Sequence, residues 1–314
     1  MAQALNSPIK LIVNPVSGRG RGVKVAAQVC RILNARGIDH NLCYSTTTHE
    51  PTALAQAALK EQCPQVVAIG GDGLVHQVAN VLVGTDTTLG IIPAGTGNDF
   101  ARGLGIPLEI DRAVDVLADG VKQAVDVGQA NDRYFFSVAV LGLAAAVNRR
   151  ANQFKHFRIN ALYTAATVAS VFLDHPIKFT VQYDGQTRYC YSWLIAVANT
   201  WSSARGMALV PAARPDDGML DACIVHGMGK WELLYTFPRV FAGRHIYSTG
   251  IETLRGRKIT ISAETPCELF ADGEYIGSLP MTLSVAPQAL KVTLPRYGED
   301  RKGSRDVVGQ SQST

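Results

Sequence analysis

Three glycine-rich segments in the first half of the chain combine backbone amides with side chains that could bind phosphate. They cover residues 14–22, 70–73 and 93–102. Each segment follows an apolar run and precedes a helical pattern. Glycine lets backbone N–H groups approach an anion closely, and the N-terminus of a helix favours negative charge. The three segments therefore predict a phosphate-binding site made largely of main-chain atoms.

The first segment carries Arg19, Arg21 and Lys24, whose positive charges would attract an anion, and a solvated flexible loop is the structural alternative. No Gly-Lys-Ser/Thr follows at P-loop spacing, and no GxGxxG sequence opens a helix there. These absences argue against ordinary P-loop NTPases and NAD enzymes.

The second segment, Gly70-Gly71-Asp72-Gly73, has one charge, the carboxylate of Asp72. A lone carboxylate among phosphate-binding amides suits a role with magnesium or as a proton acceptor. The alternative is a tight turn in which Asp72 caps the following helix. In the third segment, Thr96 and Asn98 could bond phosphate or ribose, and Asn98 or Asp99 could cap a helix.

Strands and helices must alternate if these segments are to meet at one edge of a sheet. Apolar runs at four positions predict strands, at residues 9–13, 41–44, 65–69 and 88–92. Helical patterns lie between and after them, at residues 24–36, 52–61, 75–82, 98–104 and 110–117. Residues 1–128 are therefore expected to form an α/β domain with a parallel doubly wound sheet, which binds ligands at the carboxyl ends of its strands.

The pattern changes near residue 128, after which short β-type runs dominate. Two of them flank Asp184-Gly185-Gln186, a hairpin signal. Further runs predict strands at residues 221–225, 258–262, 268–271, 282–285 and 291–294, and helical patterns interrupt them at 161–173 and 230–241. Residues 129–295 are expected to form an antiparallel β-sandwich-like domain. The polar residues 296–314 are expected to be a disordered tail.

Composition narrows the class of protein. The 314 residues are 47% hydrophobic and carry a formal net charge of +4, which gives no support to nucleic-acid binding. No apolar run approaches the ~20 residues of a membrane-spanning helix, and the first residues have no signal-peptide pattern. The six cysteines are widely spaced and are expected to be free thiols. A cytoplasmic enzyme or binding protein is therefore expected.

Two more motifs follow in the second half. Asp217-Gly218-Met219-Leu220-Asp221 is a DGxLD sequence, and Asp272-Gly273-Glu274 is a DGE sequence. Together with the three glycine-rich segments, in this order, they resemble the diacylglycerol kinase catalytic family, including its bacterial lipid kinases and the related sphingosine and ceramide kinases. Asn199 stands upstream of DGxLD, as the family's Asn does. The resemblance covers residues 9–294.

This resemblance implies ATP-dependent phosphorylation of a lipid hydroxyl, most simply that of diacylglycerol. Glu274 would be the general base, with Asp272 beside it and Asp72 as a further catalytic residue. A structural Mg²⁺ would be held by Asp217 and by the main chains of Arg214 and Met219. The nucleotide-binding set is Asn14, Pro15, Val16, Ser17, Gly18, Thr46, Gly70, Gly71, Asp72, Gly73, Gly95, Thr96 and Asn98. The lipid would be met at the membrane surface, by a protein bound peripherally to the inner face.

Several positions depart from the family pattern. Leu74, His76 and Gln77 replace the usual Thr and Asn-Glu after GGDG, which removes a hydroxyl and a carboxylate. A relative that binds nucleotide or lipid but has lost turnover is therefore one alternative. A soluble-substrate kinase of the NAD kinase or phosphofructokinase type is another, because GGDG occurs there too. The basic residues Arg149, Arg150, Lys155 and Arg158 could attract anionic headgroups or form a solvated loop face. Neither the lipid nor the oligomeric state follows from the sequence.

Overall fold

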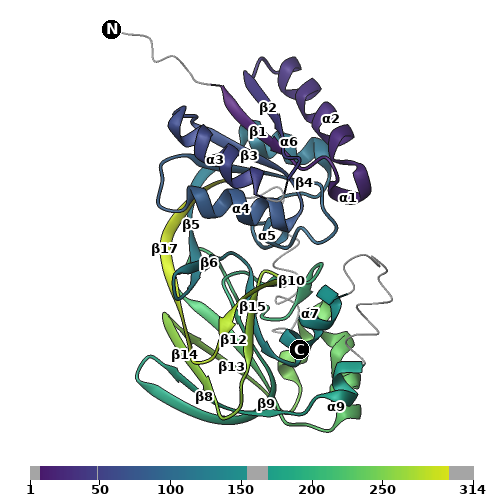
Figure 1. Ribbon diagram of the computed structural model, residues 1–314, viewed down its shortest axis with the longest axis vertical. Helices are drawn as coiled ribbons and strands as arrows, with labels where there is room; N and C mark the ends of the chain where they lie inside the picture. The colour runs from purple at the N-terminus through teal and green to yellow at the C-terminus, as the bar shows by residue number, and fades with distance from the viewer. Residues whose placement is uncertain (1–7, 48, 154–168, 297–314) are drawn as a thin grey trace, which may run out of the picture. The chain divides into compact units, whose positions relative to one another are not determined.

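The computed structural model describes residues 8–47, 49–153 and 169–296 (Figure 1). The chain divides into two compact units, of which unit 1 takes in Met1–Asp126 and Pro287–Thr314 and unit 2 takes in Val127–Ala286. The predicted boundary at residue 128 lies close to the first junction. The return of the chain to unit 1 at Pro287 has no signal in the sequence pattern. The predicted disordered tail lies, apart from Arg296, outside the described residues.

Unit 1 contains a parallel sheet with the strand order β2-β1-β3-β4. Its strands are β1 (Ile9–Val13), β2 (His40–Tyr44), β3 (Gln65–Gly70) and β4 (Thr88–Pro93). Every residue of β3 and β4 is buried, which explains their unbroken apolar sequences. The chain moves outward from β1 to β2 and then crosses back to β3, so the strand order reverses between β1 and β3. Open α/β sheets bind ligands at such a reversal, beyond the carboxyl ends of the strands.

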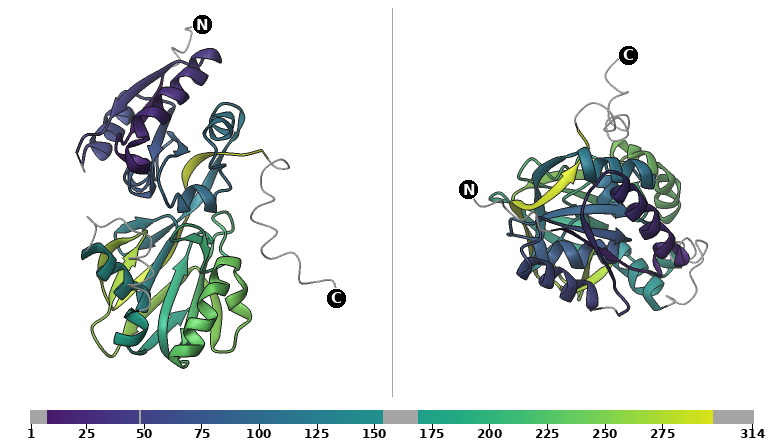
Figure 2. Two further views of the ribbon diagram at one scale, coloured as in Figure 1. Left: turned by 90° about the vertical axis from the view of Figure 1, so that its right-hand side faces the viewer. Right: turned by 90° about the horizontal axis from the view of Figure 1, so that it is seen from above.

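The helices of unit 1 pack in two pairs, α2 with α6 and α3 with α4 (Figure 2). The helices are α1 (Ser17–Gly20), α2 (Gly22–Ala35), α3 (Glu50–Lys60), α4 (Asp72–Leu82), α5 (Asp99–Gly103) and α6 (Ile110–Asp119). On α2, the buried residues Ala26, Val29 and Leu33 recur at helical spacing on one face. The predicted α/β fold with a parallel doubly wound sheet is confirmed.

Unit 2 is built from antiparallel strands. They are β6 (Arg133–Phe135), β7 (Val138–Gly142), β8 (Ile177–Tyr183), β9 (Gln186–Ala198), β10 (Ser202–Ser203), β11 (Met207–Ala208), β12 (Leu220–His226), β13 (Ile251–Gly256), β14 (Lys258–Ala263), β15 (Glu268–Ala271) and β16 (Glu274–Ser278). Strand β9 is central, since its first half pairs with β8 and its second half pairs with β7 and β12. The predicted hairpin at Asp184 and Gly185 joins β8 to β9, with both residues at positive φ. The antiparallel domain is thus confirmed.

Two strands contribute residues to both units, β5 (Val121–Ala130) and β17 (Met281–Leu294). Near the junction, the buried carboxylate of Asp126 accepts a hydrogen bond of 2.8 Å from the backbone N–H of Gln288. Within unit 1, Val292 of β17 pairs with Leu89 of β4 in parallel. The end of β17 is therefore a further strand beside β4, and it explains why Pro287–Thr314 belongs to unit 1.

The strands of unit 2 divide their side chains between two hydrophobic clusters. Along β9, Ile195 and Val197 belong to one cluster, while Ala196 and Ala198 belong to the other. This alternation follows from the two-residue repeat of a strand. The first cluster includes β8, β14 and β17 residues, which makes it the core between strands. The second cluster includes residues of helices that cover the outer face.

That helical cover consists of α7 (Leu143–Gln153), the helical residues 169–173, α9 (Lys230–Thr236), and two 3-10 helices, η1 (Phe237–Ala242) and η2 (Arg244–Tyr247) (Figures 1 and 2). The predicted single helix at 230–241 is wrong in its second half, because Pro238 lacks the N–H that an α-helix needs and the chain tightens into η1. Only residues 169–173 of the predicted helix at 161–173 lie within the described part of the chain. No helix there is long and apolar enough to cross a membrane.

Candidate functional site

The first glycine-rich segment follows β1 and packs against the third. Gly18 has a φ of +58°, and a Cβ there would lie 2.4 Å from the carbonyl oxygen of Ala94. A Cβ on Gly22 would lie 2.1 Å from the carbonyl oxygen of Asn14. The Asn14 side chain accepts a hydrogen bond of 3.0 Å from the N–H of Val16. Close backbone contacts therefore require glycine at residues 18 and 22, and they favour a packed turn over the alternative of a solvated flexible loop.

The second and third segments touch each other through their backbones. A Cβ on Gly95 would lie 2.4 Å from the Cα of Gly71, a distance that no side chain tolerates. The Asn98 amide oxygen accepts a hydrogen bond of 2.9 Å from the N–H of Gly95. Thr96 is exposed at the tip of the turn. The tertiary structure thus gathers the predicted phosphate-binding residues at the carboxyl ends of β1, β3 and β4, where the strand order reverses.

Asp72 joins the second segment to the third. Its Oδ2 accepts a hydrogen bond of 2.8 Å from the N–H of Asn98, and its Oδ1 accepts one of 2.6 Å from the N–H of Asp99. These amides are at the N-terminus of α5, where helix N–H groups lack partners within the helix. Of the two predicted caps, Asn98 stands at the N-cap position of α5 with a φ of +57°, but its side chain bonds Gly95 and makes no cap hydrogen bond. Asp72, remote in sequence, supplies that cap.

Thr46 follows β2, and its contacts are with Glu50 at the start of α3. Its N–H and its hydroxyl donate to the Glu50 carboxylate at 2.5 and 2.9 Å. These hydrogen bonds hold the pKa of Glu50 below its usual range, with the Thr46 N–H as the main cause. The structure thus gives Thr46 a role in fixing the start of α3, and its place in the nucleotide site stays a prediction.

The residues that depart from the family pattern lie on α4. Leu74 is buried, and its Cδ2 lies 2.5 Å from where a Gly70 Cβ would stand. The Leu74 side chain therefore packs against the backbone of Gly70. His76 and Gln77 are partly exposed two and three residues further along the helix.

Asp272 and Glu274 flank the tight turn between β15 and β16 in unit 2, where Asp272 and Gly273 both have positive φ. The Asp272 carboxylate accepts three backbone N–H groups, from Phe136 at 2.7 Å, Ser137 at 2.9 Å and Val138 at 3.2 Å. It therefore holds the segment between β6 and β7 in place. This geometry fits a positioning residue better than a proton acceptor.

Glu274, by contrast, has an exposed carboxylate. Its backbone pairs with Ala271 across the hairpin. Among the described residues its side chain forms no hydrogen bond or ion pair, so the carboxylate can accept a proton without breaking a structural contact.

Buried Asn199 lies behind the segment that Asp272 holds, and its side-chain amide donates to the carbonyl of Phe136 at 3.2 Å.

The predicted magnesium ligands share one loop before β12. Asp217 Oδ1 accepts a hydrogen bond of 3.1 Å from the N–H of Met219, and Asp217 Oδ2 pairs with Arg255. Burial raises the pKa of the nearby Asp221 to about 6, an effect that Arg255 opposes and Asp217 reinforces. The Arg214 side chain bonds Asp216 at 3.1 Å.

This donor set is chemically suitable for a hard cation, since it offers carboxylate and carbonyl oxygens. The buried Oδ2 of Asp221 has no hydrogen-bond partner, so this oxygen can still accept a hydrogen bond or bind a cation. Arg255 already supplies positive charge to Asp217. Within the described residues, no three His, Cys, Asp or Glu side chains gather as a metal site. A cation in this loop would thus depend on main-chain carbonyls for most of its ligands.

A cavity of about 100 Å³ lies beneath the helical cover of unit 2. Thr236 and His245 are the polar members of its lining, which is otherwise apolar. Leu233, Phe237 and Val240 close it from the cover, while Leu194 and Val225 line it from the strands, together with other apolar residues. Such a cavity suits a hydrocarbon chain and not a hydrated ligand.

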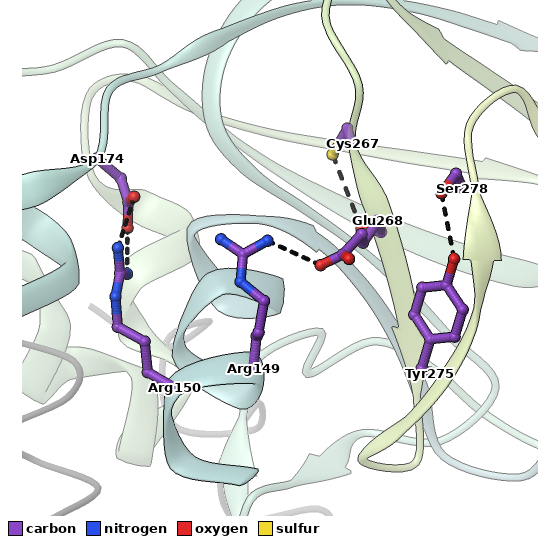
Figure 3. Close-up of polar contacts among 7 residues, drawn as sticks. All are labelled: Arg149, Arg150, Asp174, Cys267, Glu268, Tyr275 and Ser278. Atoms are coloured by element: carbon purple, nitrogen blue, oxygen red, sulfur yellow. Dashed lines mark hydrogen bonds and ion pairs between the residues drawn. The ribbon is translucent and has the colours of Figure 1, made fainter. Parts of the chain in front are cut away.

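The basic residues singled out for headgroup binding are engaged by carboxylates (Figure 3). Arg149 Nη1 lies 2.9 Å from Glu268 Oε2, and the Arg150 guanidinium pairs with both oxygens of Asp174. Lys155 and Arg158 lie outside the described residues. For the described pair, these ion pairs favour a structural role over an open anion-binding face.

Sequence reasoning missed Glu50, Arg255 and His245. Glu50 was detectable as an acidic residue in the first turn of a helix preceded by threonines. Arg255 and His245 had no sequence signal, because they reach Asp217 and the cavity only after folding.

Comparisons with known proteins agree with this architecture. The model of the diacylglycerol kinase catalytic domain matches residues 8–130. The model of the YegS C-terminal NAD kinase beta sandwich-like domain matches residues 137–294.

A diacylglycerol kinase of Mycobacterium tuberculosis (strain H37Rv) is 34% identical, with 92% of this chain and 96% of the relative covered. One of Bacillus subtilis (strain 168) is 30% identical, with 91% and 96% covered. A crystal structure of a Bacillus anthracis str. Sterne protein, described as a diacylglycerol kinase, matches this chain with a TM-score of 0.79 at 25% sequence identity. The match covers 94% of this chain and 99% of the Bacillus anthracis chain.

Proposed function

Because the chain belongs to the diacylglycerol kinase family and is a kinase acting on a lipid, we propose that it transfers the γ-phosphate of ATP to a lipid hydroxyl. The acceptor in this proposal is diacylglycerol or a lipid of similar structure, as the names of the relatives suggest. The observation that carries it is the cluster of glycine turns in unit 1, which Asp72 holds together where the strand order reverses.

The nucleotide phosphates would bind to main-chain N–H groups of these turns. Gly18, Gly71 and Gly95 pack against the backbone of a neighbouring turn, and this close packing fixes the positions of the main-chain N–H groups. Asp72 would act as a positioning residue, because its oxygens accept the N–H groups of Asn98 and Asp99. Exposed Thr96 is available to bond the nucleotide.

Glu274 would accept the proton of the lipid hydroxyl. As the hydroxyl oxygen bonds to the γ-phosphorus, its O–H bond breaks and the bond from the γ-phosphorus to the bridging oxygen breaks, with ADP leaving. Asp272 supports the hairpin that carries Glu274 through its three bonds to the β6–β7 segment. Magnesium would supply charge neutralisation at the phosphates, and Asp217, Met219 and Arg214 are the proposed ligands of a separate structural ion.

The apolar cavity of unit 2 supports a lipid acceptor. Its lining offers no ionic partner for a phosphorylated or highly hydroxylated substrate, whereas an acyl chain gains about 0.8 kcal/mol for each buried CH₂ group. We further propose that the enzyme reaches this lipid at a membrane surface.

A soluble-substrate kinase is the second candidate, because the match in unit 2 is to an NAD kinase-like sandwich. An impaired relative is the third, since Leu74 and Gln77 remove two polar groups from α4. Purified protein would be incubated with labelled ATP, Mg²⁺ and, in separate reactions, diacylglycerol in detergent micelles, NAD or fructose 6-phosphate. Labelled phosphatidic acid supports the proposal. Label in NADP or the sugar bisphosphate alone overturns it, and ATP binding without transfer indicates the impaired relative.

A further inference from the structure

The outer face of the helical cover in unit 2 is unusually rich in exposed aromatic side chains. Trp231 and Tyr235, one turn apart on α9, are 76% and 71% exposed, and Tyr247 of η2 is 68% exposed. Phe241 of η1 is also exposed, as are Phe172 and Leu173, which are consecutive in the sequence. A soluble protein rarely leaves so many large side chains together without a partner, so this surface indicates an interaction.

Some of these side chains are in direct contact with one another or with a neighbouring arginine. The rings of Phe172 and Trp231 lie 5.7 Å apart, edge to face. The Arg239 guanidinium lies 4.9 Å from the centre of the Tyr235 ring and donates a hydrogen bond of 3.1 Å to Ser248, which follows Tyr247. The six exposed residues, Phe172, Leu173, Trp231, Tyr235, Phe241 and Tyr247, are called the aromatic face below.

Basic side chains lie among the aromatic ones. From Lys230 to Tyr247 the basic residues are Lys230, Arg239 and Arg244, against one carboxylate, Glu232. The Lys230 ammonium donates to the carbonyl of Phe172 at 2.7 Å and lies over its ring. Asp174, the next carboxylate near Phe172, is neutralised by Arg150 (Figure 3). The aromatic face is therefore positively charged, and its natural complement is an anionic surface.

The chemistry of the side chains identifies that surface. Tyrosine and tryptophan combine an apolar ring with a polar tip and favour the headgroup region of a bilayer, while arginine and lysine favour anionic lipids. On the same elements, Leu233, Phe237 and Val240 face inward and line the apolar cavity. One thin helical layer thus has an aromatic, basic outer side and an inner side that encloses space for a hydrocarbon chain.

We propose that the aromatic face is the surface by which this kinase docks on a bilayer, and that its occupant is the headgroup layer of anionic phospholipid. The inference rests on the proposed function for its biological setting, since it names where a lipid kinase meets its substrate. It replaces Arg149 and Arg150 as the site of headgroup attraction, because those two arginines are held by carboxylates.

Cosedimentation of the full chain with vesicles tests the proposal without any measurement of turnover. Vesicles of phosphatidylcholine mixed with an equal amount of phosphatidylglycerol should bind the protein, and vesicles of phosphatidylcholine alone should bind it weakly. The double substitution Arg239→Gln with Arg244→Gln should lower the partition coefficient on anionic vesicles by about fivefold for each arginine removed. The double substitution Trp231→Ala with Tyr235→Ala should lower binding to both vesicle types.

Tyr189→Ala is the matched control, because Tyr189 is 82% exposed on β9 of the same unit and lies outside the aromatic face. Its vesicle binding should equal that of the wild type. Trp231 is the most exposed of the three tryptophans, so adding anionic vesicles should shift the emission to shorter wavelength. That shift should be lost in Trp231→Phe.

Equal vesicle binding by wild type and both double variants would overturn the proposal. Sedimentation velocity and cosedimentation together could also overturn it. They would do so if the wild type were a dimer while the double aromatic variant were a monomer that still bound vesicles. The detergent micelle assay separates this from the proposed function. Vesicle binding that depends on the aromatic face, in a protein without kinase activity, would leave docking standing and remove the function. Kinase activity in a protein whose vesicle binding does not depend on the aromatic face would support the proposed function and remove the docking proposal.

Discussion

The carboxylates of Asp72, Asp272 and Glu274 differ in the hydrogen bonds that they accept from the backbone. Asp72 and Asp272 accept backbone N–H groups from distant segments, whereas exposed Glu274 accepts none from the described residues. A carboxylate that accepts two or three backbone N–H groups is already engaged in holding segments of the fold together. An exposed carboxylate with no such bonds is accessible to a substrate. Contacts therefore separate the positioning carboxylates from the candidate base.

Glu274→Gln tests the base directly. The amide cannot take a proton at neutral pH, so the rate of phosphate transfer should fall by roughly 10²- to 10⁴-fold. The dissociation constant of ATP, measured by isothermal calorimetry, should stay unchanged because the predicted nucleotide residues belong to unit 1. Glu264→Gln, at an exposed glutamate of the same unit, is the control and should retain full activity. A fully active Glu274→Gln enzyme would remove Glu274 from the reaction.

Asp72→Asn tests the positioning role. Asn98 and Asp99 bond different oxygens of Asp72, and asparagine replaces one of these oxygens by an NH₂ group, which cannot accept. Losing one bond to a charged group should cost about 1.5–3 kcal/mol of unfolding free energy. ATP affinity should fall as well, because the third turn loses its anchor. Urea unfolding and calorimetry measure the two effects. Asp39→Asn, at an exposed carboxylate of unit 1, should change neither; an unaltered Asp72→Asn protein would contradict the assignment.

At the scale of elements, the helical cover of unit 2 shows how short segments divide their two sides. Helix α9 and the two 3-10 helices turn Leu233, Val240 and His245 inward and leave Trp231 and Tyr235 outside. His245 is 1% exposed and its Nε2 lies 3.0 Å from the carbonyl oxygen of Leu209. A buried imidazole at the cavity wall ties the stability of this cover to pH.

Burial lowers the pKa of His245 below its usual value, so the folded protein keeps it neutral where the unfolded chain takes up a proton. Stability should therefore fall as the pH drops below the unfolded value of about 6.5. Urea unfolding at about pH 7.5 and about pH 5.5 should show a smaller loss in His245→Gln, which has no titrating group, than in the wild type. His175→Gln, at an exposed histidine, should leave the loss unchanged. An identical loss in His245→Gln would exclude His245 as its source.

On the scale of the whole molecule, the two units divide the predicted tasks. The predicted nucleotide residues belong to unit 1, and the cavity and Glu274 belong to unit 2. The same chain nevertheless ties the units together twice, since β5 and β17 contribute residues to both. Lipid use and nucleotide binding should therefore be separable by substitutions in unit 2.

Ala144→Phe tests this division. Ala144 lines the apolar cavity, so a benzyl group there should occupy the space proposed for an acyl chain. The KM for long-chain diacylglycerol should rise by about tenfold or more if roughly two CH₂ groups lose their contacts. ATP affinity should not change. Ala53→Phe, on the exposed side of α3, is the matched control with normal kinetics. A normal KM in Ala144→Phe would show that the cavity does not receive the lipid.

The amino-acid sequence was sufficient to predict the class of each unit and the segments of the proposed phosphate site. Continuous apolar strands alternating with amphipathic helices indicate a parallel sheet, and glycine-rich turns identify its ligand-binding edge, because both signals are local in the chain. The packing of Gly18 on Ala94 could not be predicted, nor could the capping of α5 by Asp72, because each joins segments remote in sequence. The return of β17 to unit 1, the pairing of Arg255 with Asp217 and the apolar cavity are likewise long-range. Local propensity carries no information on which distant groups meet. These contacts are therefore known only from the folded structure.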